Sequence, residues 1–145
     1  MIWKRLFIPI LFLISLAIGI SHAIAQEEEL PDLTSEEIEV TVEEFMERFS
    51  KEQIPAVSDR LNDLAIMYYQ KGKYDKAIAW LFVVLKLQEK TLDKDHADVA
   101  TSLNNLAALL KAKGDYEGAE PLYRRSLSIR ESTLGKDHPT VATSL

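Results

Sequence analysis

Apolar residues return every three or four positions along most of this chain, and that spacing predicts helices. The first stretch carries one apolar stripe: Ile38, Val42, Phe45, Met46 and Phe49. Thr34 and Glu37 fit a capping box at its start, and the stretch has ended by Pro55. We therefore predict that residues 35–54 form an amphipathic capping helix, with about four turns over 35–50.

The same spacing predicts two pairs of helices, at 56–70 with 74–91 and at 98–113 with 116–133. A glycine stands in the turn of each pair, Gly72 in the first and Gly114 in the second. Both are expected to take the left-handed conformation that closes a helix. Glycine is otherwise sparse and no segment has the pattern of a strand, so the predicted class is all-α.

The helix predicted at 74–91 is apolar on all sides, because it contains the run Trp80-Leu81-Phe82-Val83-Val84. A helix that is apolar all round is expected to be buried on every face, and two hairpins would not surround it. We therefore expect a homo-oligomer, a dimer or larger. The alternative is that Trp80 and Phe82 lie beneath the helix at 35–50.

The chain repeats itself at an offset of 42 residues. Residues 61–102 and 103–144 are identical at 19 of 42 aligned positions, with no gap. A period of this length is typical of stacked helical repeats. We predict a stack of antiparallel helix hairpins over 55–145, with a third repeat that begins at Pro139 and is truncated. The acidic helix is expected to take the place of a preceding second helix and to cap that end.

The first 25 residues have the order of a secretory signal peptide. Lys4 and Arg5 precede an apolar run over 6–20, and Ala23-Ile24-Ala25 fits a cleavage site. An uncleaved N-terminal membrane anchor is the alternative, although the run is short for a span of about 20 residues. We predict a signal peptide at 1–25, an acidic flexible lead-in at 26–34, and an exported protein, periplasmic or secreted, without membrane contact after cleavage.

The formal net charge of −6 arises mainly in one segment. Residues 26–50 hold ten Asp or Glu and one Arg, whereas residues 51–145 hold thirteen acidic and fourteen basic residues. Neither part has the clustered excess of basic residues that binds nucleic acid. No nucleic-acid partner is therefore expected.

No group of residues predicts catalysis, a metal site or a cofactor. The chain has no cysteine, and His96 and His138 stand one repeat apart, so a stack would separate them. Asp95-His96 and Asp137-His138 are expected to cap helix starts instead. The sequence also lacks a convergent Ser–His–carboxylate set and a Gly-rich phosphate loop. We predict a protein that is not an enzyme and holds no cofactor.

The second repeat runs Leu103-Asn104-Asn105-Leu106-Ala107, Gly114-Asp115-Tyr116, Ala119, Leu127, Glu131, Thr133-Leu134 and Lys136-Asp137-His138-Pro139. This order resembles the tetratricopeptide repeat in its long, kinesin-light-chain form, here in a bacterial exported protein, and the resemblance covers 55–145. It implies a right-handed superhelical stack of hairpins. The chain departs from the pattern at Ala97, where proline is expected, and in the apolar helix around Trp80.

In this family the first helix of each hairpin lines a concave groove that holds an extended peptide or a partner helix. The resemblance places this groove at Asp59, Asn62, Ile66, Tyr69 and Gln70 in the first repeat, and at Thr101, Asn104, Ala108, Lys111 and Ala112 in the second. Because an amide offers both a donor and an acceptor, Asn62 and Asn104 could together hold a peptide main chain. The alternative is that both are solvated or cap a neighbouring carbonyl.

Three functions are consistent with these patterns. The first is a non-enzymatic scaffold that binds a protein or an extended peptide, whose identity the sequence does not give. The second is the N-terminal part of a larger exported protein with a catalytic or signalling domain downstream. The third is a self-associating structural module.

Overall fold

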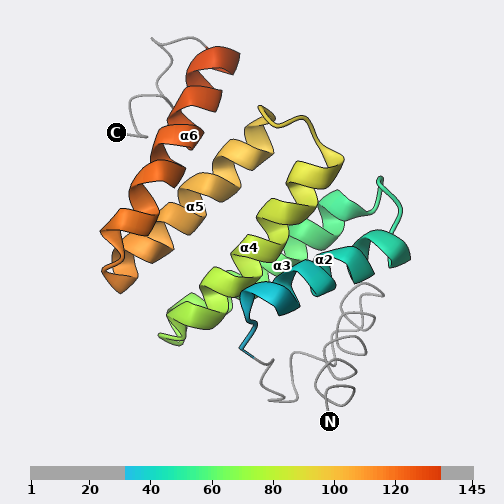
Figure 1. Ribbon diagram of the computed structural model, residues 1–145, viewed down its shortest axis with the longest axis horizontal. Helices are drawn as coiled ribbons and strands as arrows, with labels where there is room; N and C mark the ends of the chain where they lie inside the picture. The colour runs from blue at the N-terminus through green and yellow to red at the C-terminus, as the bar shows by residue number, and fades with distance from the viewer. Residues whose placement is uncertain (1–31, 135–145) are drawn as a thin grey trace.

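The computed structural model describes residues 32–134, which form five α-helices and no strand (Figure 1). The helices are α2 at Ser35–Arg48, α3 at Ile54–Gln70, α4 at Tyr74–Thr91, α5 at Ala97–Lys113 and α6 at Tyr116–Leu134. All five predicted helices are confirmed, although α2 ends and α3 begins two residues earlier than the sequence suggested. The predicted signal peptide, most of the acidic lead-in, His138 and the truncated third repeat lie outside the described residues.

Side chains cap three of the helix starts. Glu37 N–H donates to the Thr34 hydroxyl at 3.3 Å, and Thr34 N–H donates to the Glu37 carboxylate at 2.8 Å, which confirms the capping box. At α5 the cap is His96, whose Nδ1 accepts from Asp98 N–H at 3.2 Å. At α6 the Asp115 carboxylate accepts from Gly118 N–H at 2.9 Å. These bonds satisfy backbone donors that a helix start leaves without partners.

Both hairpin turns close in the same way. Gly72 and Gly114 have φ of 72° and 93°, the predicted left-handed conformation. After α3, Lys73 N–H donates to the Tyr68 carbonyl at 2.9 Å, and after α5, Asp115 N–H donates to the Leu110 carbonyl at 2.8 Å. Each bond reaches back five residues, as in the Schellman motif. The repeated sequence therefore gives a repeated turn.

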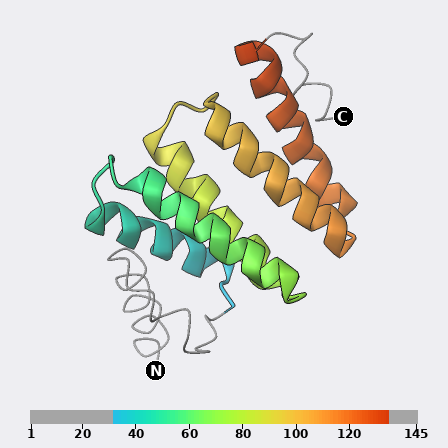
Figure 2. The ribbon, with the colours of Figure 1, turned by 180° about the vertical axis from the view of Figure 1, so that it is seen from behind.

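The helices form two hairpins that stack on one another. α3 packs against α4 and α5 packs against α6, and the hairpins meet where α4 packs against α5. α3 and α5 run in the same direction on the face turned to the viewer in Figure 2, whereas α4 and α6 lie behind them. Each hairpin thus contributes its first helix to one common face of the molecule.

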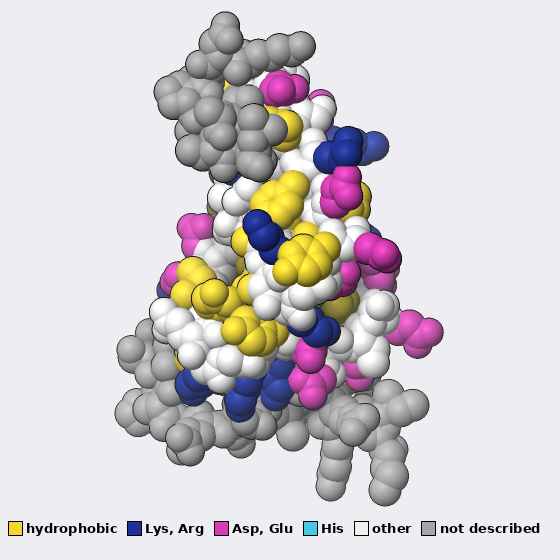
Figure 3. All heavy atoms as spheres, turned by 90° about the vertical axis from the view of Figure 1, so that its left-hand side faces the viewer, with side chains coloured by type: hydrophobic (Ala, Val, Ile, Leu, Met, Phe, Trp, Pro, Cys, Tyr) yellow, Lys and Arg dark blue, Asp and Glu magenta, His cyan; other side chains and the backbone are white. Residues whose placement is uncertain are grey.

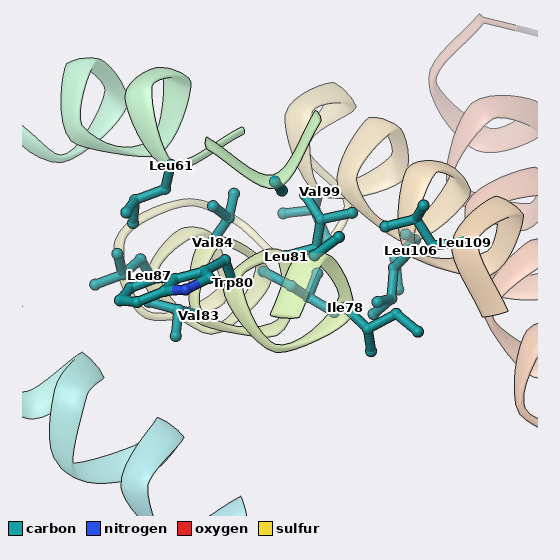
Figure 4. Close-up of a cluster of buried hydrophobic side chains, with 14 of the residues drawn as sticks. Leu61, Ile78, Trp80, Leu81, Val83, Val84, Leu87, Val99, Leu106 and Leu109 are labelled. Atoms are coloured by element: carbon teal, nitrogen blue, oxygen red, sulfur yellow. The ribbon is translucent and has the colours of Figure 1, made fainter. Parts of the chain in front are cut away.

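α4 is the centre of the hydrophobic core. Trp80, Val83, Val84 and Leu87 are 0% exposed. Figure 4 shows Trp80 between α3 and α2, while Ile78 on the other side of α4 faces α5. α3, α5 and α2 thus pack around this helix. The alternative that Trp80 lies beneath the helix at 35–50 therefore accounts for its burial, and the homo-oligomer stays a prediction.

α2 does not take the place of a preceding second helix. A helix in that place would pack on α3, as α4 packs on α5, but α2 makes its main helix contact with α4. The Glu39 carboxylate lies 2.8 Å from Lys86 Nζ and links the two helices. The reason is burial: Val42 and Phe45 on α2 are 0% and 3% exposed and belong to the core that encloses Trp80. The predicted register of this helix in the repeat is therefore corrected.

Candidate peptide-binding face

The residues that sequence reasoning assigned to a groove lie on the outward sides of α3 and α5. Asp59, Ile66, Tyr69, Gln70, Thr101, Ala108, Lys111 and Ala112 are exposed, and Asn62 and Asn104 are partly buried. The five on α3 and the five on α5 belong to the two helices that share one face in Figure 2. The structure therefore brings the predicted set onto one side of the molecule. We call this set the α3–α5 face.

An apolar stripe follows Asn62 along α3. Ile66 and Tyr69 stand four and seven residues after Asn62, which places all three on one side of the helix. Ile66 is 53% exposed and Tyr69 is 44% exposed, which makes them two of the few large apolar side chains at the surface. At the equivalent positions of α5 stand Ala108 and Lys111. The face is thus apolar on α3 and smaller and more polar on α5.

The amide oxygen of Asn62 is turned away from solvent. This Oδ1 is buried and has no hydrogen-bond partner among the described residues, and the same holds for Ser58 Oγ, Trp80 Nε1 and Gln88 Oε1. Asn104, one repeat later, is also partly buried. Neither asparagine donates to a neighbouring carbonyl in the described residues, so solvation is the alternative that stands beside peptide binding.

Thr101 uses its hydroxyl within its own helix. Its Oγ1 donates to the Ala97 carbonyl at 3.0 Å, four residues back. A hydroxyl has one donor, so that donor is not available to a ligand while this bond persists. Thr101 can still accept a hydrogen bond. Thr101 thus lies on the α3–α5 face, where its hydroxyl can accept a hydrogen bond from a ligand but not donate one.

Sequence reasoning missed the tyrosines just after the turns. Tyr74 packs edge-on against Tyr69, with ring centroids 5.6 Å apart. Tyr116 stands one repeat after Tyr74 and is 65% exposed. Figure 3 looks onto the side of the molecule where both turns lie and shows hydrophobic side chains exposed among charged ones. The repeated Gly-x-Tyr was the sequence signal that could have identified these tyrosines. Through Tyr74, the apolar stripe of α3 extends toward the turns.

Two ion pairs tie the two hairpins together. Lys113 pairs with Asp75, and Arg125 pairs with Glu89. The hydrogen bond to Asp75 raises the pKa of Lys113 above its ordinary value. Lys113 is therefore paired with a carboxylate. Lys111, the other lysine near the end of α5, lies exposed on the face and has no ion-pair partner within the described residues. The α5 side therefore offers one cation next to the small Ala108.

The described part of the chain shows no arrangement for metal binding. Nowhere in residues 32–134 do three His, Cys, Asp or Glu side chains gather as a metal site requires. Within the same residues, no helix has the length and hydrophobicity needed to cross a membrane. What the α3–α5 face offers chemically is contact: amides, an apolar stripe and one ammonium group.

Comparison with known proteins identifies the repeats. A family model described as tetratricopeptide repeat matches residues 58–132 and again residues 98–145. Together the two matches include every residue of the α3–α5 face and both hairpins apart from residues 54–57 of α3. No curated protein matches the chain. Repeats of the matching family generally mediate protein–protein interactions and are typically non-catalytic.

Proposed function

This chain belongs to the tetratricopeptide repeat family, and from that premise we propose that it is an exported, non-enzymatic scaffold that holds an extended peptide on the α3–α5 face. Its 42-residue period points to the kinesin-light-chain-like form of the repeat. The right-handed superhelix that this form implies makes the face concave. The partner is a protein segment without regular structure of its own, or a single helix.

The observation that carries this proposal is the position of Asn62. Its side chain is partly buried on the side of α3 that also carries Ile66 and Tyr69. Both of these large apolar side chains are exposed. An amide next to exposed apolar side chains suits an extended peptide, which offers main-chain polar groups as well as apolar side chains. Asn104 repeats the amide one hairpin later, at the spacing of the repeat.

The two helices of the face would make different contacts with a peptide. The amide of Asn104 can donate to and accept from a peptide main chain, whatever its side chains. The amide nitrogen of Asn62 can donate to the same main chain, since only its oxygen is shielded from solvent. Ile66 and Tyr69 would receive an apolar side chain of the peptide, and Ala108 leaves room for it on the opposite helix. Lys111 favours a carboxylate nearby. The preferred ligand is thus an extended segment that pairs one apolar residue with an acidic one.

The test is quantitative capture by residues 26–145 immobilised on a support. Peptides selected from a displayed random library are titrated against this protein and against Asn62→Ala/Asn104→Ala. We expect the double variant to bind at least roughly tenfold more weakly, since each lost main-chain hydrogen bond is worth about 1 kcal/mol. Asn105→Ala is the matched control, because Asn105 is an exposed asparagine on α5 adjacent to Asn104.

Two results would reject the proposal. The first is equal affinity of the double variant and the wild-type protein for the selected peptides. The second is an equal loss with Asn105→Ala, which would show a general effect on α5. The thermal midpoint of each variant, followed by circular dichroism, separates lost binding from lost folding.

Export is proposed on the N-terminal segment alone. Its basic start, apolar run and small-residue exit are those of a cleaved signal peptide. Cell fractionation followed by N-terminal sequencing would give Gln26 as the first residue of the exported form. Retention of the whole segment in the membrane fraction would favour the anchor instead. Self-association and a larger exported protein stay predictions.

A further inference from the structure

The two hairpin turns lie next to each other at one end of the molecule. Lys113, the last residue of α5, pairs with Asp75 in the first turn of α4. This ion pair joins the turn between α5 and α6 to the turn between α3 and α4. Figure 3 views the molecule from this side and shows exposed hydrophobic side chains among charged ones.

Three tyrosines make this end of the molecule aromatic. Tyr69 and Tyr74 flank the first turn, and their rings contact edge to face. Tyr116 follows the second turn and is the most exposed of the large apolar side chains in the described residues. Exposed tyrosines are enriched in protein interfaces, because each ring buries a large area and keeps a polar hydroxyl.

Unpaired cations stand beside these rings. Lys71 lies in the first turn and Lys111 just before the second, and both are exposed with no ion-pair partner within residues 32–134. The segments 69–76 and 111–118 together hold five lysines and three acidic residues. This end therefore carries a positive excess in a chain whose formal net charge is −6. We call Tyr69, Lys71, Tyr74, Lys111 and Tyr116 the turn-end surface.

The outer side of α2 has the opposite charge. Glu36, Val40, Glu43 and Glu47 follow one another at offsets of four, three and four residues, which places them on one side of the helix. All four are exposed, and in the part of the chain that the structure describes the three carboxylates have no ion-pair partner. The α2 outer side, defined by these four residues, thus surrounds one apolar side chain with three acids.

These two surfaces lie on different sides of one molecule. The α2 outer side points away from α4, on which α2 packs. Figure 1 shows α2 on the right of α4, whereas both hairpin turns are at the left. Contact between the two surfaces therefore requires two molecules.

We propose that the turn-end surface is a docking site for the α2 outer side of a second copy of this chain. Charge complementarity selects this occupant: Lys71 and Lys111 face the carboxylates of α2, and Val40 packs among the tyrosine rings. The charged groups orient the partner and exclude a cationic one, whereas the rings supply most of the buried area.

This contact is distinct from the proposed peptide binding and does not depend on it. Tyr69 and Lys111 nevertheless belong to both the turn-end surface and the α3–α5 face. A peptide that covers these two residues should therefore compete with the second copy.

Sedimentation of residues 26–145 over a range of concentrations tests the association. We expect the mean molar mass to exceed that of the monomer at low salt and to rise with concentration up to roughly 0.3 mM, as for a weak interface. At about 1 M salt the Debye length falls to about 3 Å, so the association constant should drop by about tenfold or more.

Charge reversal on each surface tests the contact itself. Lys71→Glu/Lys111→Glu and Glu43→Lys/Glu47→Lys should each weaken self-association by at least about tenfold, because like charges would then meet. An equimolar mixture of the two variants should associate again, since each carries a surface complementary to the other. Tyr116→Ser should also weaken association, and it serves if a reversed chain does not fold.

Lys90→Glu/Lys94→Glu is the matched control. It makes the same change in net charge with two exposed lysines, at and beyond the end of α4 opposite the turns. We expect its association to stay close to that of the wild-type chain. Circular dichroism of every variant separates lost association from lost folding.

Four results would overturn the proposal. The first is a wild-type chain that stays monomeric at low salt over the whole concentration range. The second is association that persists in either charge-reversed variant, which would mean that another surface is used. The third is an equal loss in the control, and the fourth is a mixture of the two variants that does not associate.

Discussion

At the scale of single residues, Trp80 is the large buried side chain that α2, α3 and α4 share. It is 0% exposed, lies between α2 and α3, and its Nε1 has no hydrogen-bond partner (Figure 4). The indole therefore contributes through its packed surface. The sequence predicted two alternative positions for Trp80, in a subunit interface or beneath the acidic helix. The structure shows the second.

This view of Trp80 predicts unequal effects of two substitutions. Trp80→Ala should lower the free energy of unfolding by about 3–5 kcal/mol, because it leaves a large cavity. Trp80→Phe should cost clearly less, since the phenyl ring still fills much of the space of the indole. Urea unfolding of residues 26–145 followed by circular dichroism gives both values. Similar losses for the two variants would contradict the view that filled volume sets the contribution of Trp80.

Gly114 allows a residue-scale prediction in the turn. A Cβ at this position would meet no atom within 4 Å, so the cost of a side chain is purely conformational at φ 93°. Gly114→Ala should therefore destabilise the protein by about 1–2 kcal/mol. Gly72→Ala, at φ 72° and equally open, should behave alike. A thermal midpoint unchanged in both variants would contradict this reading of the turns.

At the scale of elements, α2 is the helix whose place the sequence predicted least well. Its apolar stripe and its capping box were readable, because both depend on neighbours along the chain. Its packing position was not readable, because α2 carries no copy of the repeat. That position depends on which apolar surface of α4 the two hairpins leave exposed. Asn62 shows the same limit, since the lack of a partner for its oxygen depends on how α3 packs.

The pair between α2 and α4 predicts a pH dependence. The hydrogen bond with Lys86 lowers the pKa of Glu39 below 4.5, and the same bond raises the pKa of Lys86 above 10.5. The lowered pKa gives stability that is present above 4.5 and is lost as the pH falls through the folded value. The raised pKa gives stability that is present below 10.5 and is lost as the pH rises through the folded value.

The fluorescence of Trp80 can report this effect, because it is the only tryptophan after residue 25. We expect its emission maximum to stay at short wavelength at neutral pH, as for a buried indole. The thermal midpoint should fall at acidic and at alkaline pH. Glu39→Gln should reduce the fall at acidic pH, and Glu43→Gln, which changes an exposed acid of α2, is the control. The pair is exposed, so the change is small. An acid limb that is identical in Glu39→Gln would assign it to other carboxylates.

At the scale of the whole molecule, the helices pack in order along the stack. α6 packs on α5, α5 packs on α4, and both α3 and α2 pack on α4, so the second hairpin joins the rest of the molecule mainly where α5 meets α4. This order was readable from the sequence, because a 42-residue period places the same packing residues at the same steps. Such stacks are expected to open from an end.

That arrangement predicts where unfolding begins. Ile129 is 3% exposed on α6, and Ile129→Ala should cost about 3 kcal/mol. Hydrogen exchange of amides in α5 and α6 should then accelerate roughly a hundredfold, while α3 and α4 keep most of their protection. Exchange that accelerates equally in all helices would show a single cooperative unit instead.

The position of α2 also makes the two hairpins chemically different. One period before Lys113 and Arg125, the two cations that pair with α4, stand Lys71 and Val83. Val83 is 0% exposed in the core that α2 and α4 share. The burial of α4 beneath α2 thus requires an apolar side chain where the second hairpin carries an arginine. One of the two ion pairs that join the hairpins therefore has no counterpart on the first hairpin, although the sequence repeats.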